Sequence, residues 1–355
     1  MTKISTIGLD LAKNVFQVHA ADAAGHVVLR RRLRRREVIA FFEKLAATNG
    51  PCLVGMEACG TAHHWAREIE RLGYKARLMP PAYVKAYLKR GKSDALDAEA
   101  ICEAATRPSM RFVPIKTLEQ QSLAMLHSVR AKLVSQRTQA YNALRGHLAE
   151  LGLIAPKGEV GQARLIAMVM DEATPLPPAS RFALSSLVAQ IATAETEIDR
   201  LDRALIAEHR ASETSQRLAT IPGVGPVTAS AVRARIGDPE RFETGRGMAA
   251  WLGLTPLEDK SAETVRQKRI SKKGDRYLRR LLVSGAMGLI KQARRKPDKW
   301  PHIVRLLARM KPKQAAVAIA NKTARVLWAL LVKGGTWQPD HRPSPYLPAE
   351  PAAAA

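Results

Sequence analysis

The sequence predicts an α/β N-terminal domain, then a helical coiled-coil hairpin, then a mostly α-helical C-terminal domain. In residues 1–112, short apolar segments with strand composition are separated by helical segments. In residues 113–215, apolar side chains recur at steps of three and four residues, which is the period of packed helices. In residues 216–335, helical segments surround glycine turns, and the proline- and alanine-rich residues 336–355 are expected to be a disordered tail.

The composition favours a polyanionic partner. The 355 residues carry a formal net charge of +25, and a field of that sign attracts nucleic acid, whose released counterions add to affinity. A merely soluble or ribosome-like basic protein is the alternative. We expect no signal peptide and no membrane-spanning run of about 18 apolar residues. Three scattered cysteines are typical of a reducing compartment, so we expect the bacterial cytosol or nucleoid.

The N-terminal domain is expected to hold one sheet of five strands. The first three strands form an antiparallel meander, with Gly25 in a turn, and the later strands are separated by helices. We expect strands at 4–10, 15–20, 27–31, 51–57 and 75–79, and helices at 37–48 and 61–72. Strands separated by helices imply parallel members. The order β-β-β-α-β-α-β-α is that of the ribonuclease H-like fold.

Four carboxylates fall where this fold would bring them together. Asp10 ends the first strand and Glu57 ends the fourth, while Asp94 and Asp97 share one face of a helix start after the N-cap Ser93. Either aspartate alone would also complement the helix dipole. Clustered carboxylates repel one another unless a cation neutralises them, and hard oxygen ligands favour Mg²⁺ or Mn²⁺. Two such ions about 4 Å apart can clamp a phosphodiester transfer.

Several basic segments are candidate nucleic-acid contacts. Residues 30–36 hold six arginines in seven positions, whose alternative interpretation is a solvated strand end and helix start. A second basic stretch, at 85–90, is interleaved with Tyr83 and Tyr87, and a third, at 266–273, precedes Gly274. The candidate contacts in these segments are Arg30, Arg31, Arg32, Lys89, Arg90, Arg269, Lys272 and Lys273.

The middle of the chain reads as two long helices separated by a proline- and glycine-marked break at 152–179. We expect a long antiparallel hairpin or a dimerising coiled coil. The apolar stripe of the first helix, which includes Leu118, Met125 and Val129, is expected to be core.

The C-terminal domain opens with a helix, a glycine hairpin and a new helix around residues 221–229. Gly223 and Gly225 would let the backbone approach a phosphate, with amides at the helix start donating to it. A tight helix–helix turn is the alternative. A polar loop holding Ser261 follows, and two later helices are expected to pass through 278–282 and 313–332.

An actin-like sugar kinase also opens with a Gly-Leu-Asp strand. That fold would need a second glycine-rich phosphate loop and an adenosine motif, and neither is recognisable in the sequence. A charge of +25 also suits such a kinase poorly.

The chain resembles the transposases of the insertion-sequence 110 family, and most closely the 1111 subgroup. The resemblance rests on six motifs spread over residues 4–290: Gly8-Leu9-Asp10-Leu11-Ala12-Lys13, Met56-Glu57-Ala58-Cys59-Gly60, Lys92-Ser93-Asp94-Ala95-Leu96-Asp97-Ala98, Ile221-Pro222-Gly223-Val224-Gly225, Trp251-Leu252-Gly253-Leu254-Thr255-Pro256 and Ile270-Ser271-Lys272-Lys273-Gly274-Asp275.

The resemblance implies a RuvC-like domain whose metal-binding Asp-Glu-Asp-Asp set is Asp10, Glu57, Asp94 and Asp97. It also implies a transposase domain with Ser261 as the nucleophile, although Ala262-Glu263-Thr264 stand where the family has glycines.

The activity that the resemblance implies is DNA recombination by strand exchange through a phosphoserine link. The implied partners are double-stranded DNA, namely element ends and target, a structured non-coding guide RNA, and further copies of the chain in a dimer or tetramer. The alternatives are a RuvC-type junction endonuclease and an inactive nucleic-acid-binding relative.

Overall fold

The computed structural model describes residues 3–88, 93–261 and 264–338. These residues form two compact units, Met1–Glu119 and Gln120–Ala355.

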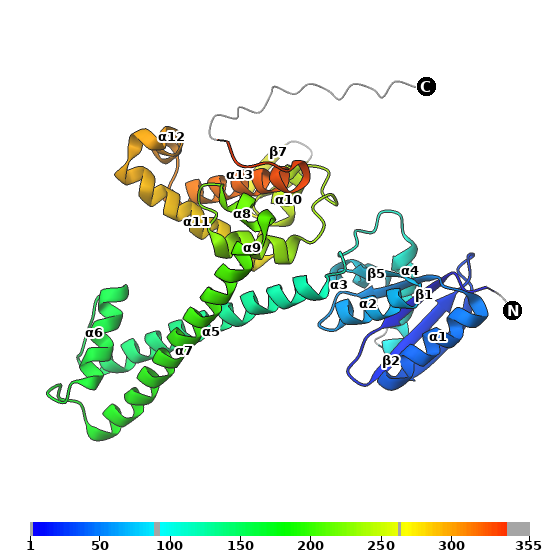
Figure 1. Cartoon of the computed structure of the whole chain (residues 1–355), viewed down its shortest axis with the longest axis horizontal. Helices are drawn as coiled ribbons and strands as arrows, with labels where there is room; N and C mark the ends of the chain where they lie inside the picture. Colours follow the sequence, from blue (N-terminus) through cyan, green and yellow to red (C-terminus); the bar gives the residue numbers. More distant parts are fainter. Residues whose placement is uncertain (1–2, 89–92, 262–263, 339–355) are drawn as a thin grey trace. The chain divides into compact units, whose positions relative to one another are not determined.

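Unit 1 is built on a mixed five-stranded sheet (Figure 1). Its strands are β1 (Thr6–Asp10), β2 (Val15–Ala21), β3 (Val27–Arg34), β4 (Leu53–Glu57) and β5 (Lys75–Met79), in the order β3-β2-β1-β4-β5. The first three strands pair antiparallel, and β1, β4 and β5 pair parallel. This topology is compatible with the ribonuclease H-like fold.

Helices cover both faces of the sheet. They are η1 (Arg35–Glu37), α1 (Val38–Asn49), α2 (Ala62–Arg71), α3 (Pro81–Val84), η2 (Lys85–Tyr87) and α4 (Asp94–Thr106). On one face Leu9, Phe16 and Leu33 pack with Phe42 of α1 and Trp65 of α2. On the opposite face α4 packs along β1, β2 and β4.

Strand β3 extends through Arg34, so most of the arginine run lies in an edge strand and not in a helix start.

Two glycines allow α4 to lie close to the sheet. A Cβ atom on Gly8 of β1 would stand 2.0 Å from the carbonyl oxygen of Ala98, and one on Gly55 of β4 would stand 2.6 Å from the Cβ of Ala105. Real Cβ atoms do not approach other atoms so closely, so only glycine fits at either position. The close approach brings the start of α4 to the end of β1.

Unit 2 begins with a helical hairpin made of α5 (Leu118–Glu150), α6 (Glu159–Met170) and α7 (Pro178–Arg210). The expected break between the long helices therefore contains a helix of its own. Its Leu165 and Val169 pack with Leu144 and Leu148 of α5 and with Ile191 of α7. A break rich in proline and glycine thus encloses enough apolar residues for a third helix to cover the hairpin end.

The expectation that the whole apolar stripe of α5 is core is wrong for its first half. Leu118, Met125 and Val129 are exposed, Leu118 by 68%. The buried side chains at this level are Leu123 and His127, because Leu123 packs with residues of α7 and α9 on that face. The other face of α5 is left to solvent.

A polar network joins the hairpin to the helices that follow. His127 is fully buried, and its two ring nitrogens lie 3.1 Å from the Tyr277 hydroxyl and 3.0 Å from the Ser230 hydroxyl. Burial, with two nearby arginines, lowers the pKa of His127 to about 4, so the ring is neutral at pH 7. Arg130 of α5 pairs with Asp202 of α7 through two hydrogen bonds.

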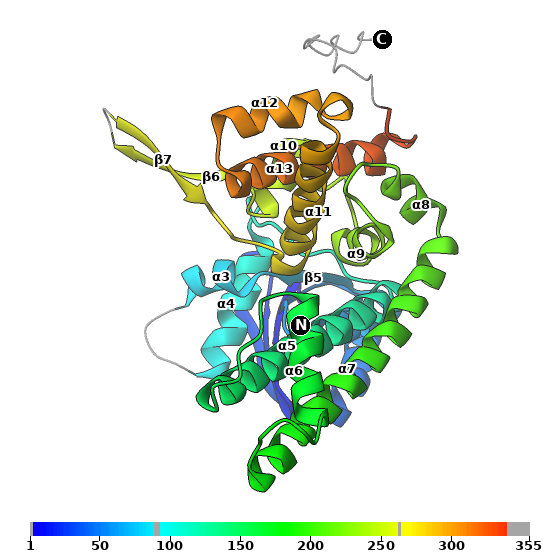
Figure 2. The ribbon, with the colours of Figure 1, turned by 90° about the vertical axis from the view of Figure 1, so that its left-hand side faces the viewer.

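The rest of unit 2 is a helical bundle with one β-hairpin. The helices are α8 (Glu213–Ala219), α9 (Pro226–Ile236), α10 (Gly245–Trp251), α11 (Arg276–Arg295), η3 (Pro297–Lys299), α12 (Pro301–Arg309) and α13 (Pro312–Lys333). Strands β6 (Pro256–Ser261) and β7 (Thr264–Ile270) pair antiparallel and extend away from the helices (Figure 2). The segment expected to be a polar loop is therefore largely a strand pair.

Among the described residues, one helix, the 22-residue α13, is long and apolar enough to cross a membrane by length and composition alone, although Lys322 and Arg325 interrupt its apolar residues. The helix supplies Ile319, Leu327 and several alanines to the core of unit 2. Helices that form the core of a globular domain can have the same length and composition as this one.

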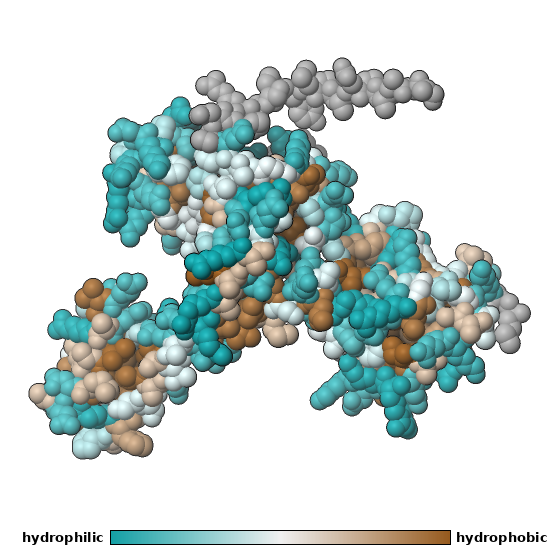
Figure 3. Space-filling model, viewed as in Figure 1, coloured by the Kyte–Doolittle hydropathy of each residue, from teal (hydrophilic) through white to brown (hydrophobic). Residues whose placement is uncertain are grey.

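The far end of the hairpin presents apolar side chains to solvent. Ile154, Val160, Met170 and Phe182 are each more than half exposed, Phe182 by 81%. Figure 3 shows apolar residues gathered at this end.

Candidate functional site

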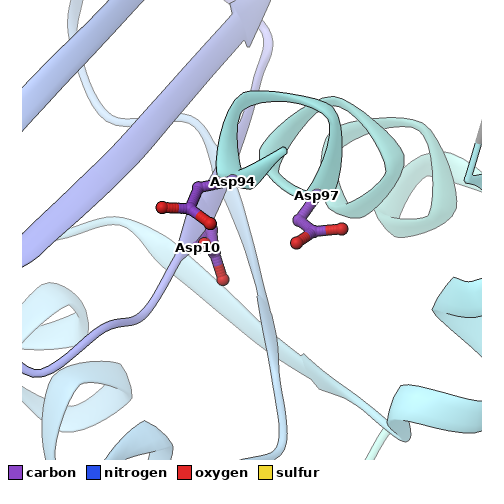
Figure 4. Close-up of side chains that lie close together, drawn as sticks. All are labelled: Asp10, Asp94 and Asp97. Atoms are coloured by element: carbon purple, nitrogen blue, oxygen red, sulfur yellow. The ribbon is translucent and has the colours of Figure 1, made fainter. Parts of the chain in front are cut away.

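Three aspartates converge at the end of β1. One carboxylate oxygen each from Asp10, Asp94 and Asp97 lies within 4.8 Å of the others (Figure 4). Asp10 is the last residue of β1, and the other two occupy the first turn of α4. Ser93 caps that helix, as expected, by accepting a hydrogen bond from the Leu96 backbone amide. The cap fixes the first turn and therefore the direction of both α4 carboxylates.

The electrostatics of this cluster are unfavourable without a cation. Burial, together with the charges of Asp97, Asp94 and Glu57, raises the pKa of Asp10 to about 6. Burial and Asp97 also raise the pKa of Glu57. These carboxylates therefore repel one another at neutral pH. Among the described residues, no basic side chain contributes to the pKa of Asp10 or Glu57 and so offsets that repulsion. Oxygen ligands in this arrangement suit a divalent cation such as Mg²⁺.

Glu57 lies beside the cluster and not within it. It ends β4, the strand parallel to β1, and its charge acts on Asp10. Among the described residues, however, only the three aspartates bring their oxygens within the 4.8 Å limit. Of the four carboxylates predicted from the sequence, the structure thus brings three together and places the fourth within electrostatic reach.

Ser261 is the last residue of β6, and its backbone pairs with Thr264 across the hairpin. The structure does not describe its side chain. Residues 262–263, where the sequence departs from the glycines of the resembling family, lie outside the described residues. Lys89 and Arg90, two predicted nucleic-acid contacts, also lie outside them.

Two sequence motifs meet at the base of the β6–β7 hairpin. A Cβ atom on Gly253 would stand 2.3 Å from the Lys273 carbonyl oxygen, and one on Gly274 would stand 1.8 Å from the Trp251 carbonyl oxygen. Lys272 adopts a left-handed backbone with φ of 56°, which is unfavourable for a residue with a Cβ. The strained turn holds Lys272 and Lys273 exposed beside the hairpin. Arg269, near the end of β7, is exposed as well.

The glycine turn between α8 and α9 has one packed side and one open side. Gly223 has φ of 81°, and a Cβ there would stand 2.9 Å from Leu289 of α11. Gly225 has no atom within 4 Å of its Cβ position. Both glycines line an open cavity of about 470 Å³ with Gly285 and Trp300. The open space beside Gly225, at the start of α9, leaves room for a group such as a phosphate.

Comparison with known proteins identifies the family. A model described as "Transposase IS116/IS110/IS902 family" matches residues 215–299, and a model of the DEDD transposases of IS110 elements matches residues 7–152. A Pseudomonas aeruginosa protein named "Probable family 20 transposase" is 48% identical over 95% of this chain and 99% of its own length.

Two further relatives carry named insertion sequences. The transposase of IS1111A from Coxiella burnetii is 37% identical over 95% of this chain and 92% of its own length. The transposase of IS1328 from Yersinia enterocolitica is 36% identical over 94% of this chain and 98% of its own length. The chain belongs to the IS110 family of transposases. The resemblance seen in the sequence motifs is confirmed, and the transposase is a DNA-recombining enzyme.

Membership gives the aspartate cluster a context. The DEDD model covers the cluster and Glu57, and a family of this kind implies a DNA substrate and use of a divalent metal. No role for Gly8 or Gly55 was predicted from the sequence, although both set the approach of α4 to the sheet. The sequence feature that could have revealed them is a glycine in the interior of each of two strands, because such a glycine often marks a place where another backbone packs closely against the strand.

Proposed function

We propose that this transposase excises and inserts a mobile element by DNA strand exchange. In this proposal a divalent metal is held by Asp10, Asp94 and Asp97, with Glu57 beside them, and Ser261 is the nucleophile. The observation that carries the proposal is the convergence of three carboxylates within 4.8 Å at the end of β1.

The donor set fits Mg²⁺ or Mn²⁺. All the side chains are carboxylates, and burial together with their mutual repulsion raises the pKa of Asp10. A bound cation would offset both effects. A bound ion would polarise the phosphodiester and stabilise charge that develops on its oxygens. Asp10 and the two aspartates of α4 hold their carboxylates towards one point because the helix cap and the glycines below α4 fix their positions.

The serine step follows from the same chemistry. The Ser261 hydroxyl oxygen would form a bond to phosphorus while the phosphorus–oxygen bond to the departing strand breaks, and the serine proton would pass, through a base, to the departing oxygen, which becomes a strand hydroxyl. After exchange, the hydroxyl of the incoming strand would attack the phosphoserine, lose its proton to Ser261 and release the serine. Arg269, Lys272 and Lys273, at the base of the same hairpin, would stabilise the charge on the phosphoryl oxygens.

A covalent adduct tests the serine role. Protein, Mg²⁺, element-end DNA and the element's own non-coding RNA are combined, and DNA of retarded mobility is sought that protease restores to its original mobility. Ser261→Ala should form no such adduct. Ser271→Ala, a matched serine that follows β7, should form it normally. An adduct of undiminished yield in Ser261→Ala would exclude Ser261 as the nucleophile.

We also propose a structured guide RNA as a partner, in line with the family resemblance. In this proposal the RNA recognises the DNA sequence by base pairing, and the protein recognises the backbone and shape of the nucleic acid. The formal charge of +25 supports a second polyanion besides DNA. Exchange that proceeds equally well without the RNA would contradict guidance. The compartment that suits these partners is the bacterial cytosol or nucleoid.

Homo-oligomerisation is the third part of the proposal. The exposed apolar end of the hairpin, which includes Val160 and Phe182, supports a dimer or tetramer, because large exposed apolar patches mark interaction sites. Sedimentation of the DNA-free protein should show a dimer or larger species. Val160→Asp with Phe182→Asp should shift it to the monomer, whereas Glu172→Gln, an exposed change nearby, should not.

A junction endonuclease is the second candidate, and one observation favours it. The aspartate cluster is complete within unit 1, so metal-dependent cutting requires nothing from Ser261. Such an enzyme would leave cut DNA ends and no adduct. An inactive relative that only binds nucleic acid would give no product in any divalent metal, and Asp10→Ala would then change nothing.

A further inference from the structure

Strand β3 divides the arginine run into two sets of side chains, because successive residues of a strand point to opposite faces of the sheet. Leu33 is buried in the core beneath α1 and α2. Arg31 shares that face, and its guanidinium lies 5.6 Å from the ring centroid of Phe41. Just after the strand, the guanidinium of Arg35 lies 5.1 Å from the Trp65 ring. These two arginines are therefore engaged in the packing of unit 1.

The alternate arginines lie on the α4 face. Arg30 donates a hydrogen bond of 3.0 Å to Glu99 of α4, which establishes the direction of this set. Arg32 and Arg34 follow on the same face, and both are exposed. Within the part of the chain that the structure describes, the Arg32 guanidinium makes no hydrogen bond or ion pair. Arg32 is thus an exposed and unengaged cation on the face that carries the aspartate cluster.

The strand register places Arg32 level with Asp10. Asp10 of β1 is paired with Gln17 of β2, and Gln17 is paired with Arg32 of β3. Directly opposed residues of antiparallel strands point to the same face. Neighbouring strands lie about 4.8 Å apart, so Arg32 is about 10 Å from Asp10 across the sheet. The intervening Gln17 is neutral and half-buried.

We propose that Arg32, with Arg34 beside it, binds the phosphodiester backbone of the DNA strand that enters the Asp10–Asp94–Asp97 cluster. This inference rests on the proposed function, since it requires DNA at that cluster. Side chains on one face of a strand recur about every 6.7 Å, which is comparable with the separation of successive phosphates along an extended strand.

The chemistry of the two sites is complementary. A carboxylate cluster repels a DNA backbone until a cation is present, and the Arg32 guanidinium, two strands away on the same face of the sheet, offsets that repulsion. Arginine suits the task because its planar guanidinium can donate hydrogen bonds to two phosphate oxygens at once. The occupant is DNA and not guide RNA, because the row Asp10–Gln17–Arg32 leads to the residues that would process a phosphodiester.

Metal-free binding tests the proposal without requiring any chemistry. The affinity of full-length protein for a fluorescent element-end duplex is measured in EDTA over a range of salt. Arg32→Gln should weaken binding about tenfold and reduce the salt slope by about 0.9, the value for one lost phosphate contact. Arg31→Gln loses the same charge on the opposite face and should weaken binding less than about twofold. Arg32→Lys should restore the salt slope.

A single neutral phosphate then locates the contact. Methylphosphonate groups are placed one at a time beside the scissile bond. At one position the losses from the neutral phosphate and from Arg32→Gln should fail to add, because both remove the same contact. Equal effects of Arg31→Gln and Arg32→Gln would overturn the proposal, as would weakened binding of structured RNA with unchanged DNA affinity.

The proposal and the proposed function can fail separately. If the wild type binds DNA through Arg32 but exchanges no strands, the recombinase assignment fails and the phosphate contact stands. If strands are exchanged at the normal rate by Arg32→Gln and its DNA affinity is unchanged, the phosphate contact fails and the recombinase assignment stands.

Discussion

A carboxylate cluster in unit 1 and a polar network in unit 2 arrange their ionisable side chains in opposite ways. In unit 1 three aspartates meet within 4.8 Å, and burial and the neighbouring carboxylates raise the pKa of Asp10. In unit 2 the ionisable groups at the junction of the hairpin and the bundle are paired. Arg130 bonds to Asp202, and Arg235 bonds to Asp275 at 3.0 Å.

The difference separates a binding site from a structural network. A group of like charges without partners adds nothing to folding and is stabilised only by a ligand of opposite charge. Paired charges and satisfied hydrogen bonds hold helices in one arrangement, and removing one partner is destabilising. We therefore expect substitutions in the aspartate cluster to affect activity, and substitutions in the junction network to affect stability.

The largest effect is expected at Asp97. Asp97→Asn should reduce strand exchange by at least about 100-fold, because a metal ligand is lost, while the midpoint of thermal unfolding without metal stays the same or rises. Glu103→Gln, on the same helix but paired with Arg107 at the surface, is the control and should retain activity. Normal exchange by Asp97→Asn in Mg²⁺ would show that the cluster is not catalytic.

The next effect concerns stability. Asp202→Ala should lower the free energy of unfolding by about 2 kcal/mol, because Arg130 loses its partner at a site that is largely shielded from water. Arg200→Ala breaks an exposed pair with Glu197 and should cost less than about 0.5 kcal/mol. Urea unfolding measures both. Similar costs for the two variants would contradict a special role for the junction pair.

His127 provides a pH-dependent form of the same test. His127→Leu leaves the hydroxyls of Tyr277 and Ser230 without their partner and should cost about 1–3 kcal/mol at pH 7.

The sign of the pH effect follows from the lowered pKa of His127. In the folded chain this pKa is about 4, below the usual value of about 6.5, so the unfolded chain binds the proton more readily. The stability that neutral His127 contributes is present above pH 6.5 and falls as the pH drops towards 4. The difference between wild type and His127→Leu should shrink over that window, and a constant difference would contradict the burial of a neutral ring.

The smallest effect is expected at Asp10 without metal. The pKa of Asp10 is raised to about 6, so its ionisation destabilises the folded state as the pH rises from about 4 through 6. Asp10→Asn should therefore unfold at a higher temperature than wild type at pH 8, and the gap should close towards pH 4. Mg²⁺ should stabilise the wild type and not the variant. A variant less stable than wild type at pH 8 in EDTA would contradict unbalanced repulsion.

Sequence patterns predicted unit 1 well because strand and helix signals there agree with the tertiary fold. The order of strands, the cap at Ser93 and the meeting of Asp10 with Asp94 and Asp97 could all be anticipated. The position of Glu57 outside the 4.8 Å group could not, since it depends on side-chain direction at the end of β4.

Unit 2 was harder to predict because its elements depend on what packs against them. The exposed stripe of α5 has the same spacing as a buried one, and only the position of α7 and α9 decides which face is covered. Helix α6 is hidden in a proline- and glycine-marked break, and β6 and β7 are too polar to resemble core strands. The arginine run was visible in the sequence, but the division of its side chains between the two faces of the sheet required the extent of β3 and its register with Asp10.

Gly8 and Gly55 determine the separation between the strand that bears Asp10 and the helix that bears Asp94 and Asp97. The spacing of the three aspartates is thus encoded by two residues that have no side chain. A variant with all four carboxylates intact but one of these glycines replaced should bind metal poorly. In judging whether a distant relative is active, these two positions are therefore as informative as the acidic residues themselves.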